Sequence, residues 1–210
     1  MAARVSIQRL GERVRWLQAL PCDCRDPADP TYGDARACTR CEHGYVYREQ
    51  VLPASVRVLL TRQRREFLHP EVGLVRVGDL TVTAMPDEIQ ISDFDKLVLI
   101  DRAAPKTELV TRGSGERDAL AEEYPLAVAV VADGDTVFVE GTDYLFDEEA
   151  GEVVWLAGGS VPGGRTYAVS YTFAPVYWYT GTMSAESRPM PGYSAPWPKS
   201  GLLQVHFQEV

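Results

Sequence analysis

The stretch LPCDCRDPADPTYGDARACTRCEHGYVY, residues 20–47, contains all four cysteines of the 210-residue chain. Their spacing is C-x-C, thirteen intervening residues and then C-x-x-C. Each close pair can supply two thiolates from one tight turn, and the loop between the pairs can bring them face to face around a tetrahedral ion. The spacing therefore predicts a structural zinc site with the ligands Cys22, Cys24, Cys38 and Cys41.

Two alternatives to this ligand set are less favoured. Cys22 and Cys24 are too close in the chain to form a disulfide with each other without strain, and no secretory signal indicates an oxidising compartment. His43 could replace one thiolate, but four cysteines already complete the coordination shell. Because such a shell leaves no open position for water or substrate, the pattern favours a structural site over a catalytic one.

The segments that flank the cysteines favour regular structure. Residues 3–10 predict a short helix that ends at Gly11. Residues 12–20, ERVRWLQAL, alternate as a half-buried strand does, and residues 44–51, GYVYREQV, predict a second strand. The loop between the cysteine pairs is dense in Pro, Asp and Gly, so we expect the metal, and not a hydrophobic core, to hold it.

Beyond Pro53 the pattern is typical of β-structure. Val- and Leu-rich runs at residues 55–62, 73–85 and 96–101 predict strands. A local basic cluster, Arg62, Arg64 and Arg65, begins at the last residue of the first of these runs. Three arginines this close can bind phosphate or carboxylate groups, although such a cluster is more often the solvated end of a strand.

Residues 101–124 are polar and interrupted, which predicts a domain junction or a long exposed loop. Within them, residues 107–112 favour a strand and residues 116–124 at most a short helix. The next segments, 126–141, 141–159 and 160–175, predict hairpins with turns at Asp133–Gly134, at 149–151 and at 162–164. Alternation in these strands predicts a core made of Tyr144, Phe146, Val154, Leu156, Tyr167, Val169 and Tyr171.

The proline-rich residues 184–201 predict an extended arm, because Pro cannot continue a helix or a central strand. Residues 202–210 alternate again and predict a last strand in this subunit's own sheet or in a neighbour's. The predicted fold class is mainly β, with an antiparallel barrel or sandwich of hairpins, an N-terminal zinc-knuckle module and a C-terminal arm. The predicted domains are 1–52, 53–124 and 125–210.

Charge is distributed unevenly along the chain, which has a formal net charge of -9. Residues 1–80 hold 13 Arg and 10 acidic side chains, whereas the remaining residues hold 8 basic and 20 acidic ones. The balance argues against a general affinity for nucleic acid. It serves solubility, or it allows complementary faces of neighbouring copies to meet in an assembly.

The sequence predicts no membrane segment and no active site. No apolar run approaches the roughly 20 residues that cross a bilayer, so we expect a soluble protein made in a reducing cytoplasm. Phosphate-binding, nucleophile-elbow and metalloprotease motifs are absent from the sequence. The acidic pairs at 122–123 and 148–149 are sequence neighbours without the opposed geometry of an acid and a base. We therefore expect a protein that is not an enzyme.

Two stretches together resemble a known group of proteins. Residues 15–49 contain a strand, a C-x-C, a Pro- and Asp-rich loop and a C-x-x-C that leads to a Gly and aromatic strand. Residues 141–179 contain a Gly-x-Asp-Tyr turn, a strand ending in Trp, a Pro-Gly-Gly turn and an aromatic strand ending near Pro. Both resemble modules of tailed-bacteriophage head-to-tail connector, or neck, proteins, particularly the β-rich head-closure type.

The resemblance implies a structural virion protein that forms a homo-oligomeric ring and contacts portal, adaptor and tail proteins, with adaptor, closure and tail-terminator roles all open. An acidic lumen would let packaged DNA slide without sticking. The alternative is a zinc-ribbon adaptor that binds nucleic acid or protein through Arg36, Arg40 and the arginines at 62, 64 and 65. A third hypothesis, a glycan hydrolase, depends only on β-richness and aromatic residues.

Overall fold

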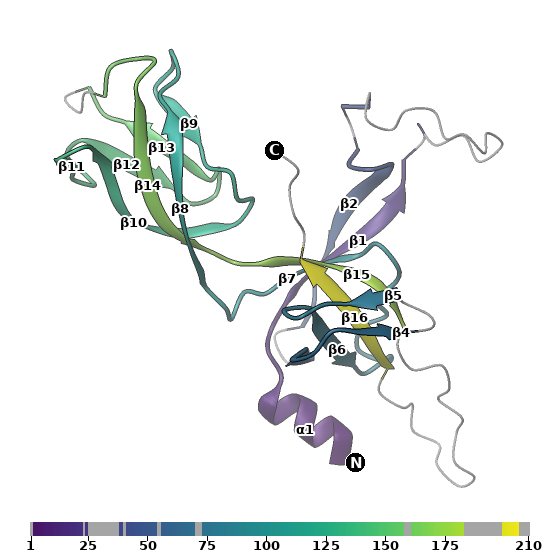
Figure 1. Ribbon diagram of the computed structural model, residues 1–210. Coiled ribbons are helices and arrows are strands. Elements are labelled where there is room, and N and C mark those ends of the chain that lie inside the picture. The colour runs from purple at the N-terminus through teal and green to yellow at the C-terminus, as the bar shows by residue number, and fades with distance from the viewer. Residues whose placement is uncertain are drawn as a thin grey trace, which may run out of the picture. The chain divides into compact units, whose positions relative to one another are not determined.

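A computed structural model describes residues 2–22, 24, 38, 39, 41–53, 56–69, 73–157, 161–182 and 199–205. The fold is mainly β with antiparallel pairing throughout its sheets, as the sequence predicts (Figure 1). The chain forms two compact units. Unit 1 comprises residues 1–101 and 176–210, and unit 2 comprises residues 102–175.

The elements of unit 1 are α1 (Ala2–Leu10), β1 (Arg15–Pro21), β2 (Tyr45–Gln50), β3 (Leu59–Arg62), β4 (Phe67–His69), β5 (Gly73–Val75), β6 (Leu80–Ala84), β7 (Lys96–Val98), β15 (Val176–Thr182) and β16 (Lys199–Val205). Unit 2 consists of β8 (Ala104–Thr111), β9 (Arg117–Ala119), β10 (Pro125–Asp133), β11 (Thr136–Phe138), β12 (Tyr144–Asp147), β13 (Glu152–Trp155) and β14 (Thr166–Phe173).

Unit 1 is built on a seven-stranded sheet with the order β2-β1-β7-β15-β16-β6-β3. Strands β15 and β16, the last two in the described residues, lie in the middle of this sheet, where Val176 of β15 pairs with Val98 of β7. Unit 2 is therefore an insertion between two hydrogen-bonded neighbours. The observed boundaries differ from the predicted ranges 1–52, 53–124 and 125–210, because β15 and β16 pair with strands far away in the sequence.

Strand β16 belongs to the chain's own sheet, which decides between the two options that the sequence left open. It pairs with β15 on one side and β6 on the other. Gly201 is required at this position, since a Cβ atom there would lie 2.1 Å from Cε2 of the buried Tyr179 ring. Most of the predicted proline-rich arm, residues 184–198, and the end of the predicted last strand, residues 206–210, lie outside the described residues.

The core of unit 1 combines residues of the strands β6, β7, β15 and β16 with residues of the segments next to the strands. Its fully buried members include Val58, Leu97, Leu99 and Leu203, each 0% exposed. The predicted helix α1 is confirmed, and its N-terminal Arg4 contacts Asp87 and Glu88.

Unit 2 packs a four-stranded sheet, β11-β10-β14-β8, and a three-stranded sheet, β12-β13-β9, around one shared core. This arrangement is the sandwich of the two predicted options. The predicted core residues Tyr144, Tyr167, Val169 and Tyr171 are all buried. The predicted phase of β13 is wrong: Val153 and Trp155 are buried, whereas Val154 and Leu156 are half-buried.

Residues 116–124 also differ from the prediction of a short helix. Residues 117–119 form β9, which pairs with β13 through Val153 and Asp118. Asp118 is only 5% exposed and accepts hydrogen bonds from the Trp155 indole, at 2.8 Å, and from the Tyr167 hydroxyl, at 2.9 Å. These residues form a strand and not a helix because β9 pairs with β13 as the third strand of the smaller sheet, and this pairing buries Asp118.

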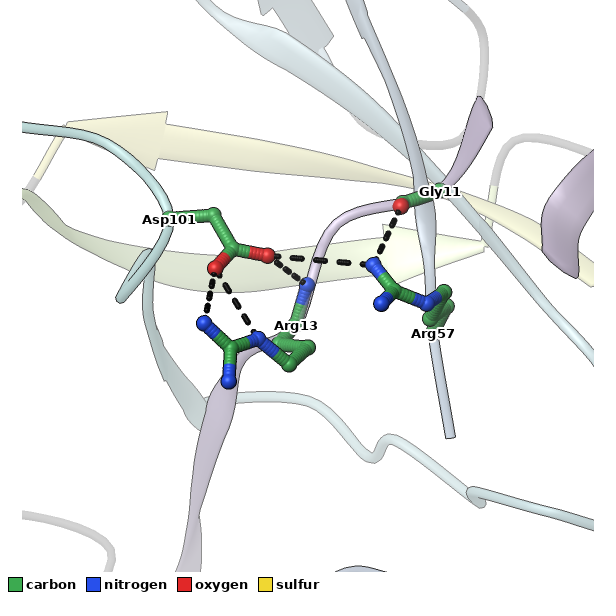
Figure 2. Close-up of polar contacts among 4 residues, drawn as sticks. All are labelled: Gly11, Arg13, Arg57 and Asp101. Carbon is green, nitrogen blue, oxygen red and sulfur yellow. Dashed lines mark hydrogen bonds and ion pairs between the residues drawn. The ribbon is translucent and has the colours of Figure 1, made fainter. Parts of the chain in front are cut away.

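The junction at the end of β7 is held by Asp101, the last residue of unit 1 before the insertion (Figure 2). One of its oxygens accepts hydrogen bonds from Arg13 Nε at 2.9 Å and Arg13 Nη2 at 2.6 Å. Its other oxygen accepts the Arg13 backbone N–H at 2.8 Å and lies 3.9 Å from Arg57, which also donates to the Gly11 carbonyl. The hydrogen bonds from Arg13 hold the pKa of Asp101 below its ordinary value.

Candidate metal centre

The β1–β2 hairpin positions the cysteines at its outer end. Register pairs run from Trp16 and Gln50 to Pro21 and Tyr45. One step further, the Cys22 backbone N–H donates to the Gly44 carbonyl at 2.9 Å. The two strands therefore deliver Cys22 and the C-x-x-C segment to the same place, although they enter it from opposite directions.

A tight turn after Cys41 closes this end of the hairpin. The N–H of Glu42 donates to the Tyr45 carbonyl and the N–H of Tyr45 donates to the Glu42 carbonyl, both at 2.9 Å. The central residues His43 and Gly44 have φ angles of 49° and 86°. Two positive φ values in succession are the requirement of the type I′ hairpin turn, which explains glycine at the second position.

The four predicted ligands come together. The Sγ atoms of Cys22, Cys24, Cys38 and Cys41 all lie within 4.8 Å of one another, and those of Cys24 and Cys41 are 3.3 Å apart. Zinc–sulfur bonds of about 2.3 Å in a tetrahedron place neighbouring sulfurs about 3.8 Å apart, so the cluster is of the right size for one ion. Cys22 is buried and the others are half-buried.

The cluster therefore fits a metal ion on its own donor atoms. No other group of three or more His, Cys, Asp or Glu side chains in the described residues is arranged to hold one. His43 does not enter the cluster, since its ring packs edge-on against Trp178 with the ring centroids 5.5 Å apart. A set of four sulfur donors suits soft or borderline ions such as zinc.

Two of the thiols, Cys24 and Cys41, have a raised pKa when no ion is bound. A hydrogen bond with Cys41 is the main cause that raises the pKa of Cys24 to about 12. Burial raises the pKa of Cys41, although the Gly44 backbone N–H opposes this rise. Because metal binding requires thiolates, binding must release these protons and must weaken as the pH falls.

An ion pair between a buried lysine and a half-buried glutamate connects the cysteine turn to the sheet. Lys96 of β7 is 1% exposed, and its Nζ lies 2.6 Å from Glu42 Oε2. The same ammonium lies 4.4 Å from the centroid of the Tyr47 ring. Burying a lysine is costly unless its charge is compensated, so Glu42 and the Tyr47 ring stabilise Lys96, and Lys96 in turn fixes the residue that follows Cys41.

Asp95, the residue before Lys96, fastens β1 to the same strand. It is fully buried and accepts hydrogen bonds from the Trp16 indole, the Ala19 backbone N–H and the Ser92 backbone N–H, each at 2.8 Å. The sequence predicts a strand that begins at Lys96, but it does not reveal the role of either Asp95 or Lys96. Charged residues next to a run of Val and Leu were the available signal, but such residues are commonly exposed.

The other residues that the sequence singled out do not form a second centre. Arg62, Arg64 and Arg65 are exposed, and within the described residues none of them makes an ion pair. Arg36 and Arg40 lie outside the described residues. Asp133, at the predicted turn of the 126–141 hairpin, pairs with Arg165 at 3.2 Å.

Comparison with models of known protein families finds no match, and neither does comparison with curated proteins. The described helices include none with the length and hydropathy that a membrane crossing requires. What the structure establishes is therefore a class of molecule: a mainly β chain with an N-terminal cluster of four cysteines that could hold a metal ion.

Proposed function

We propose that this chain is a structural virion protein of a tailed bacteriophage, a subunit of the ring that connects head to tail, in a head-closure or adaptor role. The observation that carries the proposal is the cysteine hairpin. The strand, C-x-C, C-x-x-C and aromatic strand that resemble the connector proteins fold into one hairpin whose sulfurs converge. The second resembling stretch supplies β12, β13, β14 and β15.

The ion in this centre is zinc, and its function is structural. Four sulfur donors complete a tetrahedral shell, so the ion staples the hairpin end without an open coordination site. Residues 20–47 contain few large apolar side chains, so hydrophobic burial can stabilise this segment only weakly. Metal binding supplies the stabilisation that the segment needs.

The protein is not an enzyme in this proposal. The buried carboxylates of the described residues have structural partners: Asp95 accepts from β1 donors, Asp118 accepts from groups of both sheets of unit 2, and Asp79 accepts from the Arg76 backbone N–H. A ring subunit acts by occupying a position among copies and partners, which are the portal or adaptor above it and tail proteins below. It needs contact surfaces and no reactive group.

The second candidate is a zinc-ribbon adaptor that binds nucleic acid or another protein. One observation favours this candidate: Arg62, Arg64 and Arg65 are exposed and make no ion pair in the described part of the chain. Its prediction differs in one measurable way. Binding to phosphates releases counterions, so affinity must fall steeply with salt.

The test combines particle size with binding. Metal-loaded protein is examined by sedimentation velocity and negative-stain electron microscopy, and we expect closed oligomers of uniform symmetry. Parallel gel-shift titrations with a duplex oligonucleotide at several salt concentrations should show little binding at any of them. A protein that stays monomeric at all concentrations and binds the duplex with a steep salt dependence would reject the ring and support the adaptor.

A further inference from the structure

The β4–β5 hairpin of unit 1 exposes apolar side chains beside a basic cluster. Its register pairs Phe67 with Val75 and Leu68 with Leu74. Val75 is fully buried, whereas Phe67 is 40%, Leu74 48% and Leu68 78% exposed, so the side that carries Leu68 and Leu74 is open. Figure 1 shows β4 and β5 beside β16, where Gln204 donates to the Leu74 carbonyl at 3.4 Å.

The chain that leads into this hairpin is positively charged. Arg62 ends β3, and Arg64 and Arg65 precede β4; all three are exposed, and none makes an ion pair within the described residues. We call Arg64, Arg65, Leu68 and Leu74 the basic hairpin surface. Exposed leucines next to uncompensated arginines are typical of an interface and not of an ordinary solvated strand end.

Unit 2 provides a surface of the opposite kind. It contains 5 basic and 13 acidic side chains, a net charge of -8, whereas unit 1 contains 16 basic and 17 acidic ones. On the outer side of its smaller sheet, Leu145 pairs with Val154 and Asp147 pairs with Glu152. Leu145 is 47% exposed, so this side also combines an apolar centre with charge.

Two of the glutamates on this side remain uncompensated. Arg117 neutralises Asp147, at 3.0 Å, and Glu152, at 2.8 Å. Glu148 and Glu149, in the turn between β12 and β13, are exposed and make no ion pair within the described residues. We call Leu145, Glu148, Glu149 and Val154 the acidic sheet face.

We infer that the basic hairpin surface of one copy docks on the acidic sheet face of a second copy, with leucines in the centre and Arg–Glu pairs at the rim. This inference rests on the proposed ring function and names its subunit contact. The contact joins two different surfaces, so it is heterologous. Repetition of such a contact generates a ring when the rotation closes, which an isologous two-fold contact does not.

The charges make the prediction specific. Exposed ion pairs are individually weak, but like charges placed opposite each other at an interface oppose association strongly. Reversing either surface alone should therefore place like charges face to face. Reversing one surface in one protein and the other surface in a second protein should restore complementarity at every contact of an alternating assembly.

The experiment uses the full metal-loaded chain in four forms: wild type, R64E/R65E, E148K/E149K and the matched control D93K/D135K. Asp93 and Asp135 are also exposed and lie outside both surfaces, and the control makes the same change of net charge as E148K/E149K. Sedimentation velocity at low and high salt measures association. Thermal unfolding should be nearly unchanged in all forms, because every substituted side chain is exposed.

We expect wild type and control to associate alike, and each reversed variant to associate about tenfold or more weakly. An equimolar mixture of the two reversed variants should recover the wild-type assembly, and high salt should weaken association in every case. Recovery on mixing can arise only from contacts between chains.

Four results would overturn the inference. If wild type assembles and both reversed variants assemble equally well, the contact lies elsewhere while the ring function stands. If the variants fail to associate and mixing does not restore assembly, the acidic sheet face is not the occupant of the hairpin surface. If R64E/R65E loses only binding to a duplex oligonucleotide, the occupant is nucleic acid. A wild type that never associates rejects the ring function itself.

Discussion

The change Asp118→Asn should destabilise unit 2 severely. Asp118 connects the two sheets of the sandwich, since its oxygens accept from the Gly113 backbone N–H at 2.9 Å, the Trp155 indole at 2.8 Å and the Tyr167 hydroxyl at 2.9 Å. Arg112 lies 3.4 Å away, and the exposed fractions of the two side chains are 12% and 3%. Asparagine keeps the shape of this side chain but removes its charge and one acceptor.

The expected loss follows from this geometry. Three neutral donors point at the two carboxylate oxygens of Asp118. Asparagine has one oxygen and one NH₂ group in their place, and the NH₂ group cannot accept a hydrogen bond. At least one of the three donors therefore loses its acceptor. Arg112 also loses its buried counterion, although its guanidinium retains the cation–π contact with Trp155, 5.5 Å from the ring centroid. Breaking a buried pair of this kind costs about 3–5 kcal/mol.

Hydrogen–deuterium exchange read by mass spectrometry is the assay, because it reports opening of each segment separately. Peptides from residues 102–175 should exchange roughly 100- to 4,000-fold faster in the variant, as 1.4 kcal/mol corresponds to a factor of ten. The matched control is Asp133→Asn, which removes a surface pair with Arg165 and should cost less than about 1 kcal/mol. Equal exchange in the two variants would refute the proposed role of the buried carboxylate.

Three further predictions concern the metal, a glycine and pH. Cys38→Ser should lower the metal content from about one ion per chain to none by elemental analysis and speed exchange in the cysteine hairpin alone; four freely reactive thiols in the native wild type would contradict this. Gly201→Ala should cost about 1–3 kcal/mol in urea unfolding because its methyl group would enter the Tyr179 ring, whereas Gly115→Ala, with 3.9 Å of clearance, should be nearly neutral. Burial raises the pKa of Asp118, but its hydrogen bonds and the nearby Arg112 guanidinium lower this pKa by more, so it lies below the ordinary value. Its stabilising effect is therefore complete above the unfolded pKa of about 3.9 and is lost as the pH falls through the folded value, so the urea midpoint should drop on acidification in wild type and less in the asparagine variant; parallel curves would count against the assignment.

The cysteine centre could be predicted from the sequence because the residues that specify it are close together in the chain. Two short pairs of thiols and a proline-rich loop specify a sulfur-lined site whatever the rest of the chain does. The contacts that attach the cysteine hairpin to the sheet could not be predicted. Lys96 and Asp95 stand more than 50 positions after Cys41, and only the pairing of β1 with β7 makes them neighbours of the hairpin.

Alternation and turn residues determined by themselves that the chain is mainly β, where α1 ends, and where the β10–β11 and β12–β13 hairpins turn, because these are properties of short segments. The tertiary structure alone decided that unit 2 is an insertion and that β16 returns to the first sheet. It also decided that Val153, and not Val154, faces the core. The reason is physical: period two marks two faces of a strand, but only pairing and packing against distant residues determine which face is buried and which strands are neighbours.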